Sequence, residues 1–319
     1  MLEITAALVI VIALNFYALM GGADYGGGVW DFFARGPRAE RQRELIAEAI
    51  GPIWEANHVW LILVIVVLFT AFPPAFAVIG ISLHVPVTLL LIGIVLRGSS
   101  FVFRAYGGAA DIERRRWGAV FAGSSLITPV WLGVIVGAIA SGNVADWMRW
   151  FPFAVGIFAV TLFAFLAAVY LTLETGQPEL REDFRRRALV SAIAVGVMAL
   201  AVFLFAGTGA PMIRARLGAS PWTWPLQIAT GIAAVGAFYG LWSRRWLMAR
   251  ACAVLQVSLI LWGWALAQYP YLVIPSLTIV NVAAPRATLE LLLAALVAGA
   301  MVLFPSFIYL LRVFKRRTI

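Results

Sequence analysis

Apolar stretches of about 20 residues recur along the whole chain, and short segments rich in charged residues separate them. A helix of about 20 apolar residues is long enough to cross the hydrocarbon core of a bilayer. The pattern therefore predicts a polytopic, all-α membrane protein that forms one transmembrane helical domain over residues 1–319. The nine expected helices cover residues 4–33, 44–70, 75–105, 117–140, 151–173, 187–206, 225–242, 251–268 and 287–311.

The basic residues are distributed unequally between the segments that connect these helices. The odd-numbered connections and the C-terminal tail hold 19 of the 24 Lys and Arg residues, whereas the even-numbered connections hold four. Cytoplasmic loops of membrane proteins carry the excess of Lys and Arg. The distribution predicts an N-terminus outside and a C-terminus in the cytoplasm, which requires an odd number of crossings.

The composition agrees with a membrane protein and limits its chemistry. The chain is 63% hydrophobic and only 12% charged, whereas soluble domains are about one quarter charged. A net charge of +9 is compatible with a nucleic-acid partner, but the basic residues lie between apolar spans, which favours membrane topology instead. The one cysteine, Cys252, excludes an internal disulfide and a thiolate metal site. Glu3 replaces the basic start of a signal peptide, so the first apolar stretch is expected to be a retained span.

Among the ionisable side chains inside the predicted spans, four stand out. They are Asp24 in the first helix, Glu55 and His58 in the second, and Arg97 in the third. Ionisable groups in hydrocarbon are costly, so each is a candidate functional residue. Residue counts from the helix ends place all of them in the cytoplasmic half, and Glu55 and His58 share one helical face. The convergence predicts a proton path from the cytoplasm, while a structural ion pair between Arg97 and Asp24 or Glu55 stays open as the alternative.

Glycine and proline residues mark the same region as unusual. Gly51 and Pro52 interrupt the second predicted helix one turn before Glu55, which frees backbone carbonyls that need polar partners. Glycines that let another helix approach closely surround Asp24, at positions 21, 22, 26, 27 and 28. The two histidines, His58 and His84, lie in different spans without a paired ligand, so we expect no haem or metal in this chain.

Several motifs together resemble subunit II of the cytochrome bd quinol oxidases. Residues 21–33 read GGADYGGGVWDFF, residues 50–76 read IGPIWEANHVWLILVIVVLFTAFPPAF, and residues 95–106 read VLRGSSFVFRAY. Residues 269–285 read YPYLVIPSLTIVNVAAP, which is similar to the C-terminal region of that family. The run P-x-W-[DE]-x-N-x-V-W is far more specific than a hydropathy match. The chain looks like the short branch of the family, which is often grouped with cyanide-insensitive oxidases.

The resemblance implies a fold and a function. The fold is two four-helix bundles plus one peripheral helix. The function is that of a terminal oxidase in a bacterial inner membrane, which takes electrons from quinol and reduces dioxygen to water with protons from the cytoplasm. The b-type and d-type haems are expected in subunit I, with no redox cofactor in this chain and a structural quinone left open. The implied partners are subunit I, a small single-helix subunit as a further candidate, and membrane lipid.

The resemblance also implies roles for individual residues. Glu55 matches the acid of the W-[DE]-x-N motif, and Asp24 the acid of a D-x-G-x-G motif in the first helix; Arg97 matches the arginine that ends the third helix. These residues are expected to belong to a proton-uptake route. Trp60 matches a tryptophan at the membrane mouth of an oxygen tunnel. No residue of this chain is expected to be catalytic itself.

This sequence departs from the family pattern at two positions of the expected proton route. His58 stands where some members have glutamine, and Val102 where some have aspartate, so the inner part of the route is in question. Three alternatives are a proton-coupled secondary transporter, a purely structural assembly subunit of the oxidase, and a homo-oligomer without subunit I. A transporter predicts broken helices in both halves of the chain, whereas the Gly and Pro interruptions lie chiefly in the first half.

Overall fold

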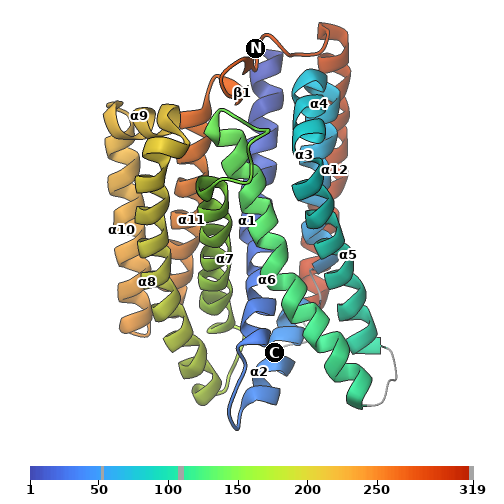
Figure 1. Cartoon of the computed structure of the whole chain (residues 1–319). Coiled ribbons are helices and arrows are strands. Elements are labelled where there is room, and N and C mark those ends of the chain that lie inside the picture. The colour runs from blue at the N-terminus through green and yellow to red at the C-terminus, as the bar shows by residue number, and fades with distance from the viewer. Residues whose placement is uncertain (52–53, 107–110, 316–319) are drawn as a thin grey trace.

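The computed structural model describes residues 1–51, 54–106 and 111–315, and these residues form a bundle of long helices (Figure 1). The helices are α1 (Leu2–Phe32), α2 (Ala39–Ile50), α3 (Trp54–Ala71), α4 (Pro73–Ser82), α5 (His84–Tyr106), α6 (Asp111–Ser141), α7 (Trp150–Leu171), α8 (Pro178–Gly209), α9 (Pro211–Ala219), α10 (Thr223–Trp242), α11 (Trp246–Gln268) and α12 (Arg286–Lys315). A hairpin of two short antiparallel strands, β1 (Tyr271–Val273) and β2 (Leu277–Thr278), interrupts the all-α pattern before α12.

The expected membrane-spanning architecture is confirmed. Within the described residues, eight helices are individually long and apolar enough to cross a membrane. A bent pair, residues 57–71 of α3 with α4, supplies the ninth candidate span. The N-terminus and the last turns of α12 lie at opposite ends of the bundle, as an odd number of crossings requires (Figure 1). Which end faces the cytoplasm stays a prediction from the arginine distribution.

Two of the predicted helices are wrong in detail, because each is two helices. The range 44–70 contains the end of α2 and all but the last residue of α3, and α2 ends at Ile50, next to the expected interruption at Gly51. The range 75–105 contains most of α4 and α5, and the axes of α3 and α4 differ by 118°. Pro73 opens α4, and a proline disfavours helical backbone at the residue before it. This bend falls at the expected boundary between residues 70 and 75. The break between α4 and α5 at Leu83 lies inside an apolar run, and hydropathy did not reveal it.

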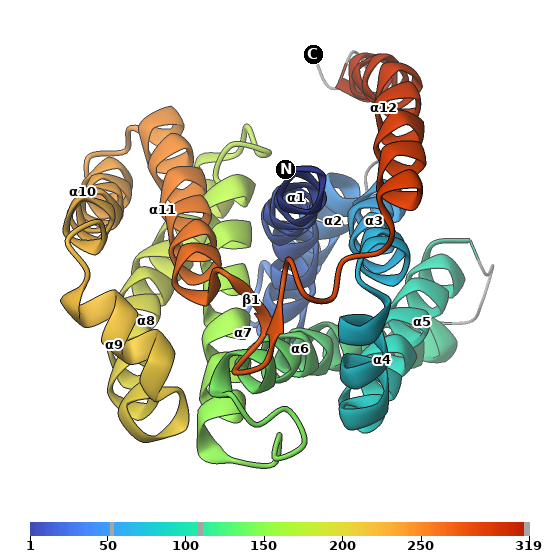
Figure 2. The ribbon, with the colours of Figure 1, turned by 90° about the horizontal axis from the view of Figure 1, so that it is seen from above.

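The nine spans divide into two bundles and one outlying helix, as expected. We call α1, α3, α5 and α6 the first bundle, and α7, α8, α10 and α11 the second bundle. Viewed along the helices, α1 and α7 lie in the middle and α12 stands at the edge (Figure 2). The bundles meet closely, since a Cβ atom at Gly26 of α1 would overlap the carbonyl oxygen of Phe163 on α7.

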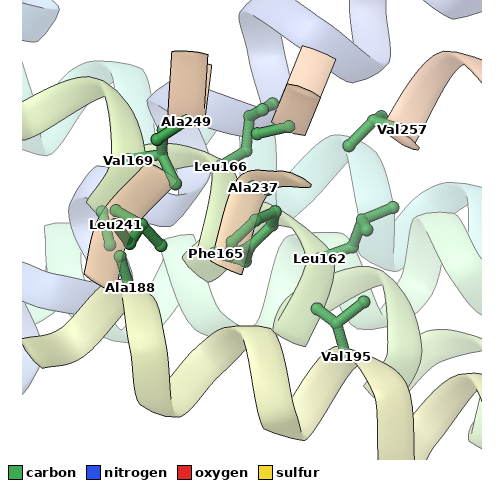
Figure 3. Packing of buried hydrophobic residues seen from close by; sticks show 12 residues of the cluster. Leu162, Phe165, Leu166, Val169, Ala188, Val195, Ala237, Leu241, Ala249 and Val257 are labelled. Carbon is green, nitrogen blue, oxygen red and sulfur yellow. The ribbon is translucent and has the colours of Figure 1, made fainter. Parts of the chain in front are cut away.

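The second bundle has an apolar core. Leu162, Phe165 and Leu166 of α7 point toward residues of the other three helices, among them Val195 of α8 and Val257 of α11 (Figure 3). The same core includes Val169, Ala188, Ala237, Leu241 and Ala249 (Figure 3). The first bundle holds its charged side chains at the corresponding place, as described next.

Candidate functional site

A buried ion pair joins α1 to α5 inside the first bundle. The guanidinium of Arg97 donates two parallel hydrogen bonds to the carboxylate of Asp24, of 2.7 Å from Nη2 to Oδ1 and 2.9 Å from Nη1 to Oδ2. Nη2 also donates to the backbone oxygen of Asp24 at 3.1 Å. Arg97 is 1% exposed and Asp24 is 2% exposed. The structure therefore brings together two of the four predicted residues in the bidentate geometry that binds most strongly.

The remaining contacts of Arg97 come from α6 and from aromatic rings. Its Nε donates to the hydroxyl of Ser125 at 2.9 Å, and that hydroxyl donates to the backbone oxygen of Phe121 at 2.7 Å. The rings of Tyr25 and Phe121 each lie 4.9 Å from the guanidinium carbon. Every nitrogen of the guanidinium thus has a partner, and the two rings contribute cation–π attraction. Arg97 is held in one position by three helices.

A polar group of α1 and α3 lies beside the ion pair. The hydroxyls of Tyr17 and Tyr25 are 3.2 Å apart. The ring of His58 lies 6.3 Å from the ring of Tyr17 and 6.4 Å from that of Tyr25, between their centres. The Nδ1 atom of His58 is buried and has no hydrogen-bond partner among the described residues. His58 therefore lies beside the two tyrosines, one of which, Tyr25, also faces the guanidinium of Arg97, and one ring nitrogen of His58 is available for a further contact.

Asn57 adds a second incomplete contact in the same place. Its side chain is fully buried, and its amide nitrogen donates to the backbone oxygen of Met20 at 3.4 Å. Its Oδ1 atom is buried and unpartnered within the described part of the chain. Buried polar groups are normally satisfied by protein or by ordered water. Two unsatisfied acceptor or donor atoms on adjacent residues indicate a place where water or a proton-carrying group would bind.

Glu55 is the predicted site residue that the structure does not place. Its backbone lies in the first turn of α3, three residues before His58, but its side chain lies outside the described residues. Residues three apart share a helical face, so the expected proximity of Glu55 to His58 stays a prediction. The other position in question, Val102, lies on α5 with 38% of its surface exposed.

Trp60, the expected oxygen-access residue, is 7% exposed. Its ring stacks on that of Phe16 with the ring centres 4.5 Å apart and the planes 18° apart. It belongs to an apolar cluster with Ala13, Tyr17 and Phe163. Within this chain Trp60 is a packed residue of the first bundle next to the polar group, and its role in oxygen access is untested by these contacts.

A second ion pair, which the sequence reasoning missed, lies further along the same two helices. Arg104 of α5 donates to Asp31 of α1 at 3.0 Å, and Asp31 is 4% exposed. Seven residues separate Asp24 from Asp31, and seven separate Arg97 from Arg104. Because α1 and α5 run in the same direction, equal spacings repeat the same pairing two turns later. That matched spacing of acids and arginines was a signal in the sequence.

The donor atoms present do not favour a metal or haem held by this chain. Among the described residues, no three His, Cys, Asp or Glu side chains are close enough to share a metal ion. His58 lies inside the first bundle, whereas His84 begins α5 and bonds the backbone oxygen of Ile81 at 2.9 Å. A haem with two histidine ligands does not fit this arrangement.

Nine spans in two bundles with a charged interior in one of them define a polytopic membrane protein that buries ionisable groups. The family model for cytochrome bd terminal oxidase subunit II matches residues 2–314 of the chain. The chain belongs to this family.

Individual relatives agree with the family. The chain is 30% identical over 218 residues to a Bacillus subtilis cytochrome bd ubiquinol oxidase subunit 2, a match that covers 64% of this chain and 61% of that protein. A putative cytochrome bd menaquinol oxidase subunit II of the same organism is 22% identical over 99% of this chain and 97% of its own length. The solved structure of the bd oxidase from Geobacillus thermodenitrificans matches with a TM-score of 0.78 and 21% identity, covering 98% of each chain, which shows the shared fold.

Proposed function

We propose that this chain is the subunit II of a bacterial quinol-oxidising terminal oxidase of the inner membrane, assembled with a subunit I. The family match over residues 2–314 and the printed functions of the relatives support the assignment. The complex would oxidise quinol and reduce dioxygen to water, with b-type and d-type haems in subunit I supplying the electron transfer.

The contribution of this chain is proton uptake through the first bundle, and the polar group around Arg97 carries that proposal. Arg97 donates two hydrogen bonds to the carboxylate of Asp24 and one to its backbone oxygen, so the Asp24 side chain is held in one position. His58 has an unpartnered Nδ1 beside it, and an imidazole can accept and release a proton near neutral pH. Protons would pass through Glu55 and His58, while Asp24 and Arg97 hold the site together.

The variant Glu55→Gln tests this assignment. If Glu55 relays protons, oxygen consumption by the purified complex should fall by about 10-fold or more, since positioned proton-transfer groups contribute about 10²–10⁴-fold. The haem content and the visible spectrum should stay unchanged. Glu48→Gln, on the exposed face of α2, is the matched control and should consume oxygen at the wild-type rate.

The outcome also separates the alternatives. Unchanged turnover of Glu55→Gln over a broad pH range would reduce Glu55 to a structural role. A native preparation without a haem-containing partner, but with solute-dependent uptake, would contradict the oxidase and favour a transporter. The bent pair identified among the described helices, α3 with α4, lies in the first bundle, whereas a transporter of inverted repeats requires a counterpart in the second.

Oxygen access past Trp60 is a separate part of the proposal. Dioxygen is apolar and would enter from lipid along apolar side chains, so Trp60→Ala should change the oxygen dependence of turnover by a few-fold and leave the quinol dependence unaltered. Trp131→Ala on α6, whose ring contacts Trp147 and Phe153, is the control and should alter neither. A change in the quinol dependence alone would remove Trp60 from the oxygen route.

A further inference from the structure

A cleft rich in arginine lies at the end of the bundle that carries α2, where the segment after α1 meets the start of α8. We call this the basic cleft. Its main cavity has a volume of about 210 Å³, and a neighbouring cavity of about 320 Å³ shares three of its residues, Arg38, Asp183 and Arg186. The main cavity is lined by Arg35, Pro37, Arg38, Gln42, Asp183, Arg186 and Arg187. Four arginines and one carboxylate therefore face one small volume.

The single carboxylate that lines the main cavity already accepts hydrogen bonds from two neighbouring side chains. Asp183 accepts bonds of 2.7 and 2.8 Å from Arg38 and one of 2.8 Å from Gln42. The hydrogen bond to Asp183 raises the pKa of Arg38, so this guanidinium stays charged and its charge is compensated. Among the described residues, Asp183 forms no salt bridge with the other three arginines that line the cavity, Arg35, Arg186 and Arg187.

Arg187 and Arg35 form no salt bridge with a carboxylate among the described residues, although Asp183 lies near enough to Arg187 to attract its charge. Arg187 donates to neutral oxygens, Oε1 of Gln42 at 2.6 Å and the backbone oxygen of Phe33 at 3.4 Å. Its Nη1 atom is buried and has no hydrogen-bond partner among the described residues. Arg35 is exposed and makes no hydrogen bond or salt bridge to another described residue. Arg186 forms a long salt bridge of 3.4 Å with Glu182. The same carboxylate is bonded more closely to Arg185, at 2.6 Å.

Apolar side chains border the same cleft. Phe32 and Phe33, at the end of α1, are 47% and 45% exposed. The ring of Trp30 lies 5.2 Å from the guanidinium carbon of Arg187. A free phosphate would need only the arginines. A phospholipid needs cations for its phosphate and an adjacent apolar surface for its acyl chains, and this edge of the protein offers both.

We propose that the basic cleft binds the phosphate group of an anionic phospholipid headgroup through Arg35, Arg186 and Arg187. Guanidinium groups bind phosphate oxygens in pairs, and basic pockets between membrane helices on the cytoplasmic side suit such headgroups. The bound phosphate would neutralise the charge that Asp183 leaves uncompensated. The site would tie the segment after α1 in the first bundle to α8 in the second. This inference does not depend on the oxidase function.

The test is lipid binding by the full complex, measured by native mass spectrometry during titration with phosphatidylglycerol or cardiolipin. The double variant Arg35→Gln/Arg187→Gln should weaken binding on the order of 30-fold, since each surface arginine contributes to attraction of an anionic lipid. Arg114→Gln/Arg115→Gln, which removes two exposed arginines at the start of α6, is matched in charge and should change binding by less than about 2-fold. The single variant Arg35→Gln removes no internal bond and should by itself weaken binding on the order of 5-fold.

Three results would overturn the proposal. Equal loss in the two double variants would show that only total charge matters. Inorganic phosphate at millimolar concentration that displaces the lipid, or that binds equally well in the absence of lipid, would identify a free anion as the ligand instead. Retention of phosphatidylglycerol at wild-type strength by Arg35→Gln, in a correctly folded complex, would likewise remove the basic cleft from lipid binding.

Discussion

The two bundles of this protein are built on the same plan of four long helices but differ in what fills them. In the second bundle, Phe165, Leu166 and Val169 lie among alanines and other aliphatic residues (Figure 3). In the first bundle, the guanidinium of Arg97 and the carboxylate of Asp24 are almost fully buried. The second bundle shows that this chain can pack four membrane helices with neutral side chains alone.

The difference favours the proposal that the polar residues of the first bundle serve more than packing. Burial of an ion pair removes two charges from water, and replacement of such a pair by apolar residues is often neutral or stabilising. Two buried atoms without a partner among the described residues, at His58 and Asn57, lie in the first bundle, and α11 of the second bundle holds two more, at Trp264 and Gln268. Polar groups retained at such a cost are typical of functional sites in membrane proteins. In this proposal the second bundle supports the first, which it contacts closely where Gly26 of α1 meets α7.

The largest effect is expected when the buried pair is broken on one side. Arg97→Met leaves Asp24 buried without a partner and should lower the free energy of unfolding by about 3–5 kcal/mol. Chemical unfolding of the purified complex, followed by tryptophan fluorescence, measures it. The double variant Asp24→Leu/Arg97→Met removes both charges and should recover most of this loss. Equal stability of the single and double variants would show that the loss in Arg97→Met does not come from the unpaired carboxylate of Asp24.

In the second bundle, a core variant is expected to lower the free energy of unfolding without lowering oxygen consumption. Leu166 is 0% exposed, so Leu166→Ala should lower the free energy of unfolding by about 2–4 kcal/mol through the cavity it leaves. Oxygen consumption per haem should stay at the wild-type value, because the second bundle carries no part of the proposed proton route. Leu200→Ala, at a residue 59% exposed toward lipid, is the control and should change stability by less than about 0.5 kcal/mol. Reduced turnover without reduced stability would contradict the division of roles.

The smallest changes in the free energy of unfolding are expected for two buried serines, one from each bundle. Ser125 accepts a hydrogen bond from Arg97, so Ser125→Ala should cost about 1–2 kcal/mol, the usual contribution of a bond to a charged group. Ser191 of α8 bonds only backbone oxygens of its own helix, at 2.7 and 3.2 Å, so Ser191→Ala should cost about 0.5 kcal/mol or less. Thermal unfolding of the two variants in the same detergent gives the difference. Identical shifts would mean that Ser125 does not support the ion pair.

The fold was largely predictable because lipid imposes simple rules. Long apolar segments gave the spans, and the structure confirms nine candidates in two bundles with α12 outside them. The errors fall where hydropathy has no information. The amphipathic helix α2 alternates charged residues with a buried face of Leu45, Ile46 and Ile50, so it was read as part loop and part span. The break between α4 and α5 at Leu83 lies inside an apolar run, whereas the bend between α3 and α4 falls at the expected boundary between residues 70 and 75.

The sequence predicted several residues of the candidate site, but it did not predict which of them contact one another. Asp24, His58 and Arg97 were found because an ionisable residue is rare inside a span, and the structure places them together. Tyr17 and Ser125 were missed, because a hydroxyl in a membrane helix is common and carries no such signal. Asp31 was missed because it lies near the end of α1, where acids are ordinary, although its spacing from Asp24 equals that of Arg104 from Arg97.

The sequence by itself determined which segments cross the membrane, how their ends differ in charge, and which spans bury ionisable groups. These follow from the free energy of transfer of each side chain into lipid, a property that acts residue by residue. Only the tertiary structure decided that Arg97 bonds Asp24, which lies 73 positions earlier in the chain. That choice depends on which helices are neighbours and how each is rotated. Close contacts, such as Gly26 against α7 and Gly28 against Ser125, determine the neighbours and the rotation of each helix. Such contacts depend on two helices and cannot be read from the sequence of one.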